Sequence, residues 1–496
     1  MSKLLKNQSP ETQTPHMLKQ LLKIVIYILL LVVVITAYQP LMKLDNNYVI
    51  AEEGLVDLTD FDFTGGRARV LARDWEYYPE HLYTPQDFQA DGIIDSIYEN
   101  NVNSAEYGTY RVTLLLPSGK TYGMTGRSFL FSTKVYINGE LVGEIGNPGD
   151  TAEATVPCTN TYAFYFTPQS DSTEIIFQVA NFQMEDGGGS FSFSLGEAVQ
   201  VEQYRMTRLA GAVVVVGALI TVTLLFIGMF IFFTNRRSFL FYALLTLMIA
   251  ARVFLTGDKP IMEFFPSLDW IVSIRAEYLN FILIFVFALL YFYTLYKKLI
   301  WKPVLFTALG LSTVYGGIVL LASPMLFGAL NIYFYLLCGA TGLYALVRLA
   351  LGLKKGGMER ALIFIGLLFF LLAAVNDLIQ YSLPVFMEFY DIISVGMLMF
   401  VFINMIALTI GFTKTERELD EAKRHEEELA AKTDFYHHMA HDLLTPLTRI
   451  STNIQVASME EETDRERLRE SQKDIMLIKD MVQNALSEGR KDGEHP

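Results

Sequence analysis

Residues 208–233 read RLAGAVVVVGALITVTLLFIGMFIFF, a run that carries no charged side chain after Arg208. About 20 apolar residues in a helix are enough to cross the hydrocarbon core of a bilayer. Six more apolar runs follow. Together with the first they predict a seven-helix membrane region over 208–412, with spans at 208–233, 238–256, 271–296, 303–322, 326–352, 361–382 and 389–412. The chain is therefore predicted to be a multi-pass membrane protein.

The composition agrees with a membrane protein of two to four domains. Of the 496 residues, 52% are hydrophobic and 19% are charged, whereas about a quarter of a soluble protein is charged. The net charge of −14 excludes a nucleic-acid binder, which would need a basic face. The two cysteines, Cys158 and Cys338, lie far apart, which excludes a disulfide framework and a zinc site built on cysteines.

A further apolar run at 21–38 follows a basic tail at 1–20. It is predicted to be a membrane anchor or a signal peptide. The residues at its end, Ile35-Thr-Ala-Tyr-Gln39, contain no A-x-A-like cleavage site, which favours the anchor.

The flanking charges predict the orientation, because Lys and Arg concentrate in cytoplasmic loops. Basic clusters lie before the first apolar run and then at alternate loops of the seven-helix region: Lys3, Lys6, Lys19, Lys23, Arg236, Arg237, Lys297, Lys298, Lys302, Lys354, Lys355, Arg360, Lys414 and Arg417. The N- and C-termini are therefore expected in the cytoplasm and residues 40–207 outside.

A few polar side chains interrupt the spans, and such groups are costly in lipid and often functional. Arg275 and Glu277 lie near the outer end of their span, so they are expected to reach the interface, with a signalling role as the alternative. Asp377 lies deeper, where a partner on a neighbouring helix is plausible.

The outside segment, 40–207, is predicted to be a β-sandwich. Residues 43–208 hold 24 Asp and Glu but 10 Lys and Arg, and this difference of 14 equals the net negative charge of the chain. The pair Asn138-Gly139 is a strong hairpin signal. It sits among short runs of β-forming residues separated by turn residues, at 110–117, 133–137, 141–145, 162–166, 174–180 and 190–195. Many short strands at this spacing are typical of a sandwich.

After residue 412 the chain becomes charged and helix-favouring, and an apolar seam predicts a coiled-coil linker at 413–434. The seam steps by three and four through Leu419, Ala422, Glu426, Leu429, Thr433, Tyr436, Ala440, Leu443, Leu447, Ile450 and Ile454, a pattern that favours a parallel homodimer. A polar break at 458–464 precedes a second amphipathic helix. Residues 435–490 are thus predicted to be a helical hairpin that dimerises into a four-helix bundle.

The run FYHHMAHDLLTPLTRI, residues 435–450, contains the candidate catalytic residues. A histidine nucleophile needs one ring nitrogen free and the other held by an acceptor. His441 follows the seam residue Ala440 and should point outward, while Asp442 is adjacent and suited to orient the ring as a base. Thr445 lies one turn on, on the face of His441. Pro446 is expected to kink the helix.

Two other interpretations of these histidines remain. His437 and His441 have the i, i+4 spacing of zinc ligands, although the metalloprotease motif would need Glu in place of His438. The histidines could also be ordinary solvent-exposed residues of a helix, with no chemical role. Neither alternative uses the Thr-Pro-Leu that follows, and no metal site is predicted.

This run resembles the phosphoacceptor box of bacterial sensor histidine kinases. The matching positions are Phe435, Met439, His441, Asp442, Leu443, Thr445, Pro446, Leu447 and Ile450, and the chain departs from the family at Leu444, where Arg is usual. The resemblance implies that His441 accepts phosphate from ATP, with Mg2+, and passes it to the receiver domain of a response regulator. It also implies that Thr445 places a water that dephosphorylates that regulator.

The β-segment carries a second resemblance, through Gly108-Thr-Tyr-Arg-Val112 and Val135-Tyr-Ile-Asn-Gly-Glu-Leu-Val-Gly143. It is similar to the jelly-roll module of seven-transmembrane receptors with diverse intracellular signalling modules, and to the sugar-binding domain of some glycosidases. This implies a small extracytoplasmic ligand, with carbohydrate as one class. Trp75, Tyr77 and Tyr78 are candidates to stack on a sugar, although such rings are more often core residues. No motif places a carboxylate pair for glycoside hydrolysis.

An ATP-binding domain is expected to be absent from this chain. There is no Walker A motif, and the family's ATP-binding module would follow the second helix, where the sequence ends. The chain is therefore expected to be a fragment or a naturally truncated form that needs an ATPase domain in trans. A sensor histidine kinase of the bacterial inner membrane is the leading hypothesis. The alternatives are a non-enzymatic receptor or scaffold, a transporter and a G-protein-coupled receptor.

Overall fold

The computed structural model describes residues 47–90, 93, 96–99, 106–127, 132–158, 161–183, 192–233, 236–257, 259–296, 299–353, 357–382, 392–457 and 464–491. The tail at 1–20 and the apolar run at 21–38 lie outside these residues. The chain divides into two compact units, Met1–Ala407 and Leu408–Pro496. The first contains a β-domain and most of the apolar helices, and the second contains a pair of amphipathic helical segments.

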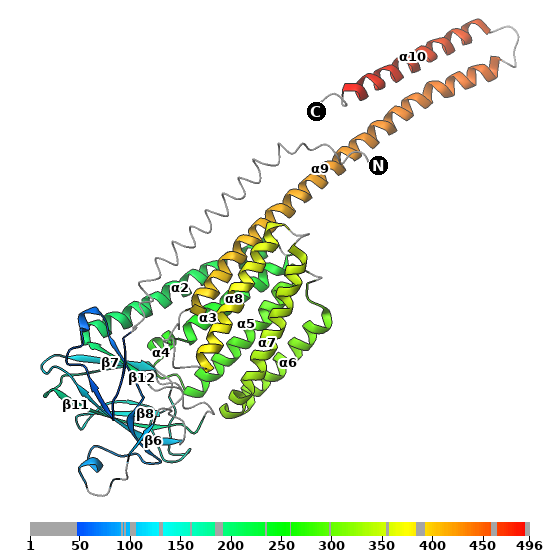
Figure 1. Cartoon of the computed structure of the whole chain (residues 1–496). Helices are drawn as coiled ribbons and strands as arrows, with labels where there is room; N and C mark the ends of the chain where they lie inside the picture. Colours follow the sequence, from blue (N-terminus) through cyan, green and yellow to red (C-terminus); the bar gives the residue numbers. More distant parts are fainter. Residues whose placement is uncertain are drawn as a thin grey trace. The chain divides into compact units, whose positions relative to one another are not determined.

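The β-domain is a sandwich of two sheets, as predicted (Figure 1). One sheet has the order β1 (Tyr48–Ile50), β3 (Ala68–Leu71), β12 (Ser192–Glu197), β7 (Tyr122–Arg127) and β10 (Thr161–Phe166). The other has the order β5 (Ile97–Glu99), β4 (Trp75–Pro79), β6 (Tyr107–Leu115), β11 (Ser172–Ala180), β8 (Ser132–Ile137) and β9 (Glu140–Ile145), with β2 (Leu55–Asp57) paired to β6.

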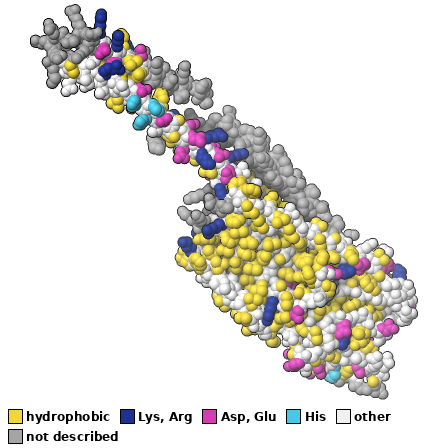
Figure 2. Space-filling model, turned by 180° about the vertical axis from the view of Figure 1, so that it is seen from behind, with side chains coloured by type: hydrophobic (Ala, Val, Ile, Leu, Met, Phe, Trp, Pro, Cys, Tyr) yellow, Lys and Arg dark blue, Asp and Glu magenta, His cyan; other side chains and the backbone are white. Residues whose placement is uncertain are grey.

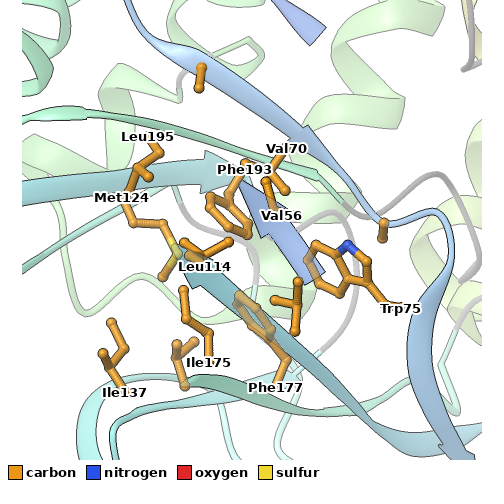
Figure 3. Packing of buried hydrophobic residues seen from close by; sticks show 14 of the residues in the cluster. Val56, Val70, Trp75, Leu114, Met124, Ile137, Ile175, Phe177, Phe193 and Leu195 are labelled. Carbon is orange, nitrogen blue, oxygen red and sulfur yellow. The ribbon is translucent and has the colours of Figure 1, made fainter. Parts of the chain in front are cut away.

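The sandwich core follows from the alternation along each strand. Val112 and Leu114 of β6 face inward, as do Ile175 and Phe177 of β11, and all four are at most 1% exposed. Figure 3 shows these strands meeting the other sheet through Phe193 and Leu195.

The hairpin between β8 and β9 forms at Asn138 and Gly139, with φ angles of 49° and 86°. Asn and Gly tolerate this left-handed conformation, which a two-residue hairpin turn requires at both positions. The predicted turn and the two strands that flank it are therefore confirmed.

The predicted spans correspond to helices: α2 (Ala198–Phe232), α3 (Arg237–Leu255), α5 (Trp270–Leu295), α6 (Lys302–Leu321), α7 (Pro324–Gly352), α8 (Met358–Ser382) and α9 (Ile392–Ala457). Among the described residues, six helices are long and apolar enough to cross a membrane. Figure 2 shows a broad apolar surface over the bundle. Such a surface suits lipid rather than water.

Polar side chains within the bundle pair with protein groups. Glu277 forms an ion pair with Lys259, which precedes the short helix α4 (Pro260–Phe264). Arg275 donates a 3.2 Å hydrogen bond to the carbonyl oxygen of Ala322. Both side chains thus have protein partners, and their position at the membrane interface stays a prediction. The side chain of Asp377 lies outside the described residues.

Helix α2 begins at Ala198, directly after β12, rather than at residue 208. Its first turns pack on the β-domain, where Val201 is fully buried. A polar chain extends from this point. The Tyr165 hydroxyl donates a 2.6 Å hydrogen bond to Glu202, and Arg205 forms ion pairs with Glu202 at 3.2 Å and with Glu263 of α4 at 2.6 Å. The β-domain is therefore joined to the end of the bundle that holds α4.

Helix α9 is continuous over 66 residues, so the last predicted span and the helix of the histidine motif form one element. Residues 413–457 contain no glycine and consist largely of helix-forming residues. Helix α10 (Asp464–Lys491) follows. Both predicted helices of the hairpin are thus present.

Candidate functional site

His441 lies on an exposed surface of α9. Its side chain is 76% exposed, and its Nδ1 lies 3.4 Å from Oδ1 of Asp442, whose side chain is 64% exposed. When Nδ1 carries the proton, it donates to this carboxylate, and the lone pair of Nε2 is then available. A histidine nucleophile needs an arrangement of this kind, here with a long contact between ring and acid.

Thr445 lies one turn beyond His441. Its hydroxyl donates a 3.1 Å hydrogen bond to the carbonyl oxygen of His441. Thr448 and Thr452 make the same i−4 bond along this helix, so the bond itself reflects helix geometry. It nevertheless fixes the Thr445 side chain on the helix face that carries His441.

Pro446 lies inside α9 and is buried, whereas its neighbours Thr445 and Leu447 are exposed. It has no amide proton, so the carbonyl oxygen of Asp442 receives no helix hydrogen bond from this position. The helix nevertheless continues to Ala457. Leu444, where the sequence departs from the resembled motif, is 61% exposed beside the histidine.

The other histidines of the motif have different neighbours. Nε2 of His438 lies 3.7 Å from Oδ1 of Asp434, and the His438 side chain is 75% exposed. Within the described part of the chain, no group of three or more His, Cys, Asp or Glu side chains is placed to hold a metal ion. The zinc interpretation therefore has two histidines in the right spacing and no third ligand from these residues.

An ion pair that the sequence did not reveal joins α9 to α10. Nε of Arg449 lies 3.2 Å from Oδ2 of Asp474, and the Asp474 side chain is only 9% exposed. The two residues are 25 positions apart and belong to different helices, so no local pattern could pair them. The contact holds α10 beside α9 two turns beyond His441.

The aromatic candidates of the β-domain are core residues. Trp75 and Tyr77 are each 2% exposed, with ring faces stacked on Phe177 at 5.6 Å and on Tyr110 at 4.4 Å. Tyr78 is 5% exposed. The hypothesis that these rings stack on a sugar is therefore corrected, because protein side chains already cover them.

Tyr78 has a polar role as well. Its hydroxyl donates a 2.9 Å hydrogen bond to Glu76, and burial together with this bond raises the pKa of Tyr78 to about 12. Glu76 also pairs with Arg111 at 3.0 Å, and Arg111 pairs with Glu174 at 2.7 Å. The charged side chains on this face of the sheet therefore satisfy one another.

Two parts of this chain match known family models. Residues 211–410 match the family model described as 7TM diverse intracellular signalling. Residues 431–494, which include α9 from Ala431 and the whole of α10, match the model described as His Kinase A (phospho-acceptor) domain. A search of curated proteins found no match.

Phospho-acceptor domains of this type typically dimerise and pass phosphate to response regulators, and their kinases use ATP and Mg2+. No catalytic ATPase domain is matched in this chain. The two matches, a seven-helix receptor region followed by a histidine phospho-acceptor domain, support a membrane sensor histidine kinase with a seven-transmembrane receptor region.

Proposed function

We propose that His441 is the phosphoacceptor of this kinase and that it passes the phosphoryl group to the receiver domain of a response regulator. The observation that carries this proposal is the exposed imidazole of His441, with Nδ1 beside Asp442 and Nε2 directed away from that contact. A nucleophile that must meet two other domains in turn has to be accessible from outside its own helix.

The described residues around His441 provide a nucleophile, a base and a hydroxyl, but no basic or glycine-rich cradle for a nucleotide. ATP would supply the phosphoryl group, with Mg2+ neutralising its charge, from a catalytic domain acting on this hairpin. His441 would use the lone pair of Nε2 to form the new N–P bond while the bond between the γ-phosphorus and the bridging oxygen of ATP breaks and ADP leaves. Asp442 would hold the proton on Nδ1 and stabilise the positive charge that develops on the ring.

Thr445 is assigned to the opposing reaction, the dephosphorylation of the response regulator. Its hydroxyl lies one turn from His441, where it could hold a water aimed at the phosphorylated receiver domain. This role is separable from phosphoryl acceptance, because the Thr445 hydroxyl donates to the backbone carbonyl oxygen of His441 and not to its imidazole.

The phosphoacceptor unit is proposed to act as a parallel homodimer. The seam side chains Leu419, Leu429, Leu447 and Ile454 are between 47% and 59% exposed in the single chain. A second copy would bury these positions, and α9 and α10 from two chains would form a four-helix bundle.

The β-domain is proposed to sense a small extracytoplasmic ligand, with carbohydrate as one class. The protein would lie in the inner membrane, with the β-domain outside and the C-terminus in the cytoplasm. The alternating basic loops support this orientation. Because α9 is one uninterrupted helix, a rotation or shift of its membrane segment would reach His441 directly.

The decisive experiment measures incorporation of phosphate from labelled ATP into the full chain in membrane vesicles, alone and with a separate histidine-kinase ATPase domain. The expected result is label in the wild type with the added domain, no label in His441→Gln, and full label in His438→Gln. The last variant is a matched control, since His438 is equally exposed on the same helix and also lies near an aspartate. Equal label in His441→Gln would exclude His441 as the acceptor.

The alternative is a receptor or scaffold that signals through its dimeric helices alone. The continuity of α9 favours it as much as it favours a kinase. Signalling that persists in His441→Gln would support the scaffold.

A further inference from the structure

The first turns of α2 are fixed to two strands of the β-domain. Val201 is 0% exposed, and a Cβ atom at Gly123 of β7 would lie only 2.9 Å from the Cβ atom of Val201. The strand therefore needs glycine at this close approach. One residue further along α2, Glu202 accepts the 2.6 Å hydrogen bond from the Tyr165 hydroxyl of β10. A displacement of β7 and β10 would therefore carry this part of α2 with it.

The short helix α4 is held by an ion pair at each end. Near its C-terminal end, Glu263 pairs with Arg205 of α2 at 2.6 Å. At its N-cap, Lys259 pairs with Glu277 of α5, and the side chains of this second pair are 11% and 18% exposed. Because α4 is five residues long, the two pairs act on one short element that lies between α2 and α5.

The backbone that leads into α4 is a sharp bend. Gly257 and Lys259 have φ angles of 70° and 47°, and the left-handed conformation is unfavourable for Lys259 because it carries a side chain. Such a conformation persists only where the surrounding contacts maintain it, and the ion pair with Glu277 is a contact of this kind. The position of α4 therefore depends on side-chain pairs and is not fixed by a continuous helix from α3.

We propose that α4 transmits displacements of the β-domain to α5, through the Arg205–Glu263 pair at one end and the Lys259–Glu277 pair at the other. A movement of α2 shifts Arg205, which moves Glu263 and with it α4. Lys259 then displaces Glu277 near the start of α5.

The displacement can continue from α5 to the helix that carries His441. The Tyr291 hydroxyl of α5 bonds to Asn404 of α9. This conformational device goes beyond the phosphoryl transfer proposed for His441, because it describes how the β-domain acts on the bundle and not what the output reaction is.

A second route from the β-domain is available through direct packing of α2 on α3. Phe226 of α2 and Tyr242 of α3 form an edge-to-face contact, with 4.6 Å between ring centroids. The two routes can be separated by experiment, because the α4 route depends on ion pairs that single substitutions of Glu by Gln remove. Those substitutions leave the aromatic contact between α2 and α3 unchanged.

The test measures amide hydrogen exchange in the full chain in nanodiscs, for peptides that cover α4 and the first turns of α5. Gly123→Ala perturbs the β-domain side without a ligand, because its added Cβ atom would overlap with Val201 and displace α2 from the sheet. Glu263→Gln removes the pair between α2 and α4, and Glu277→Gln removes the pair between α4 and α5.

Glu144→Gln is the matched control, since Glu144 pairs with Lys134 inside the β-domain and the same charge is lost. It should leave exchange in α4 and α5 unchanged. The Arg205–Glu263 side chains are 36% and 40% exposed, so Glu263→Gln should speed exchange in α4 by about two- to fivefold, in the range of exposed ion pairs.

Gly123→Ala alone should speed exchange by a similar factor in both α4 and the start of α5. In the Glu263→Gln background, adding Gly123→Ala should have no further effect on either peptide. In the Glu277→Gln background, it should still change α4 but no longer change α5.

The proposal is overturned if Gly123→Ala changes exchange at the start of α5 equally in the wild type and in Glu263→Gln, a result that would assign transmission to the packing of α2 on α3. It is also overturned if Gly123→Ala changes neither peptide. Tyr165→Phe, which removes only the hydrogen bond to Glu202, replaces Gly123→Ala if that variant does not fold. Exchange does not require phosphoryl transfer, so a chain in which His441 accepts no phosphate would leave this test intact.

Discussion

The hydroxyl of Tyr291 donates a 3.1 Å hydrogen bond to Oδ1 of Asn404, and both residues are 0% exposed. This contact ties α5 to α9. Nδ2 of Asn404 in turn donates a 2.8 Å hydrogen bond to the carbonyl oxygen of Phe400, and the Tyr242 hydroxyl of α3 donates to the carbonyl oxygen of Val401. The helix that carries His441 is therefore held within the bundle by polar contacts from two neighbouring helices, 37 residues before the histidine.

Asn404→Leu should leave the Tyr291 hydroxyl buried without an acceptor. The cost should be about 1 kcal/mol of stability, in the range of hydrogen bonds between membrane helices. It should also change the basal phosphorylation of the chain, because the contact with α5 would no longer fix how α9 is rotated about its own axis. Thermal unfolding in nanodiscs and labelling with an added ATPase domain measure the two effects. Thr313→Val, on an exposed face of α6, should change neither.

A double-mutant cycle of Asn404→Leu with Tyr291→Phe tests whether the two residues act as a pair. The combined loss should be smaller than the sum of the single losses, with a coupling of about 0.6 kcal/mol. Strict additivity in stability and in labelling would show that the hydrogen bond carries no shared effect.

Gly366→Ala should disturb the same contact from α8. A Cβ atom at Gly366 would lie 2.7 Å from Nδ2 of Asn404, which is too close for an unchanged structure. Asn404 is held by its own hydrogen bonds, so the helices must separate, at a cost of about 1–3 kcal/mol. The change in basal labelling should follow that of Asn404→Leu. Gly310→Ala is the control, since nothing lies within 4 Å of a Cβ there, and it should preserve both stability and labelling.

Arg449→Ala should loosen the hairpin, because the Asp474 carboxylate is 9% exposed and would lose its cation. The expected loss is about 1–3 kcal/mol for an unpaired buried group. Faster amide hydrogen exchange in α10 would report it. The charge exchange Arg449→Asp with Asp474→Arg should recover part of the protection, whereas no recovery would indicate that the pair acts through packing alone.

The sequence predicted elements whose signals are local. The Asn138-Gly139 turn, the strands around it and the apolar spans each follow from residues close together in the chain, and so does the histidine motif on an exposed helix. The Tyr291–Asn404 and Arg449–Asp474 contacts join residues 113 and 25 positions apart. Such pairs depend on how helices pack, which one sequence does not specify.

The aromatic residues of β4 illustrate the same limit. Trp75 and Tyr77 are two residues apart in β4 and therefore share a face of the sheet, but this spacing does not state which face is covered. The second sheet supplies that information, since Phe193 of β12 packs 5.9 Å from Trp75. The continuity of α9 through the end of the membrane region was also missed, because the change from apolar to charged residues suggested a boundary where the backbone has none.

Acid should weaken the junction between the β-domain and α2 through Asp62. Hydrogen bonds from the side chain and the backbone of Thr64 lower the pKa of Asp62 below its usual value of 3.8. A depressed carboxyl pKa contributes stability that is present above the unfolded value and is lost as the pH falls through the folded value. The turn matters for the junction because the next residue, Phe63, accepts a hydrogen bond at its carbonyl oxygen from Gln200 of α2. Thermal unfolding of the full chain between pH 5 and about pH 3 should show a smaller decrease for Asp62→Asn, whose amide can still cap the turn but cannot titrate. An identical pH profile for the wild type and the variant would exclude Asp62 as a contributor.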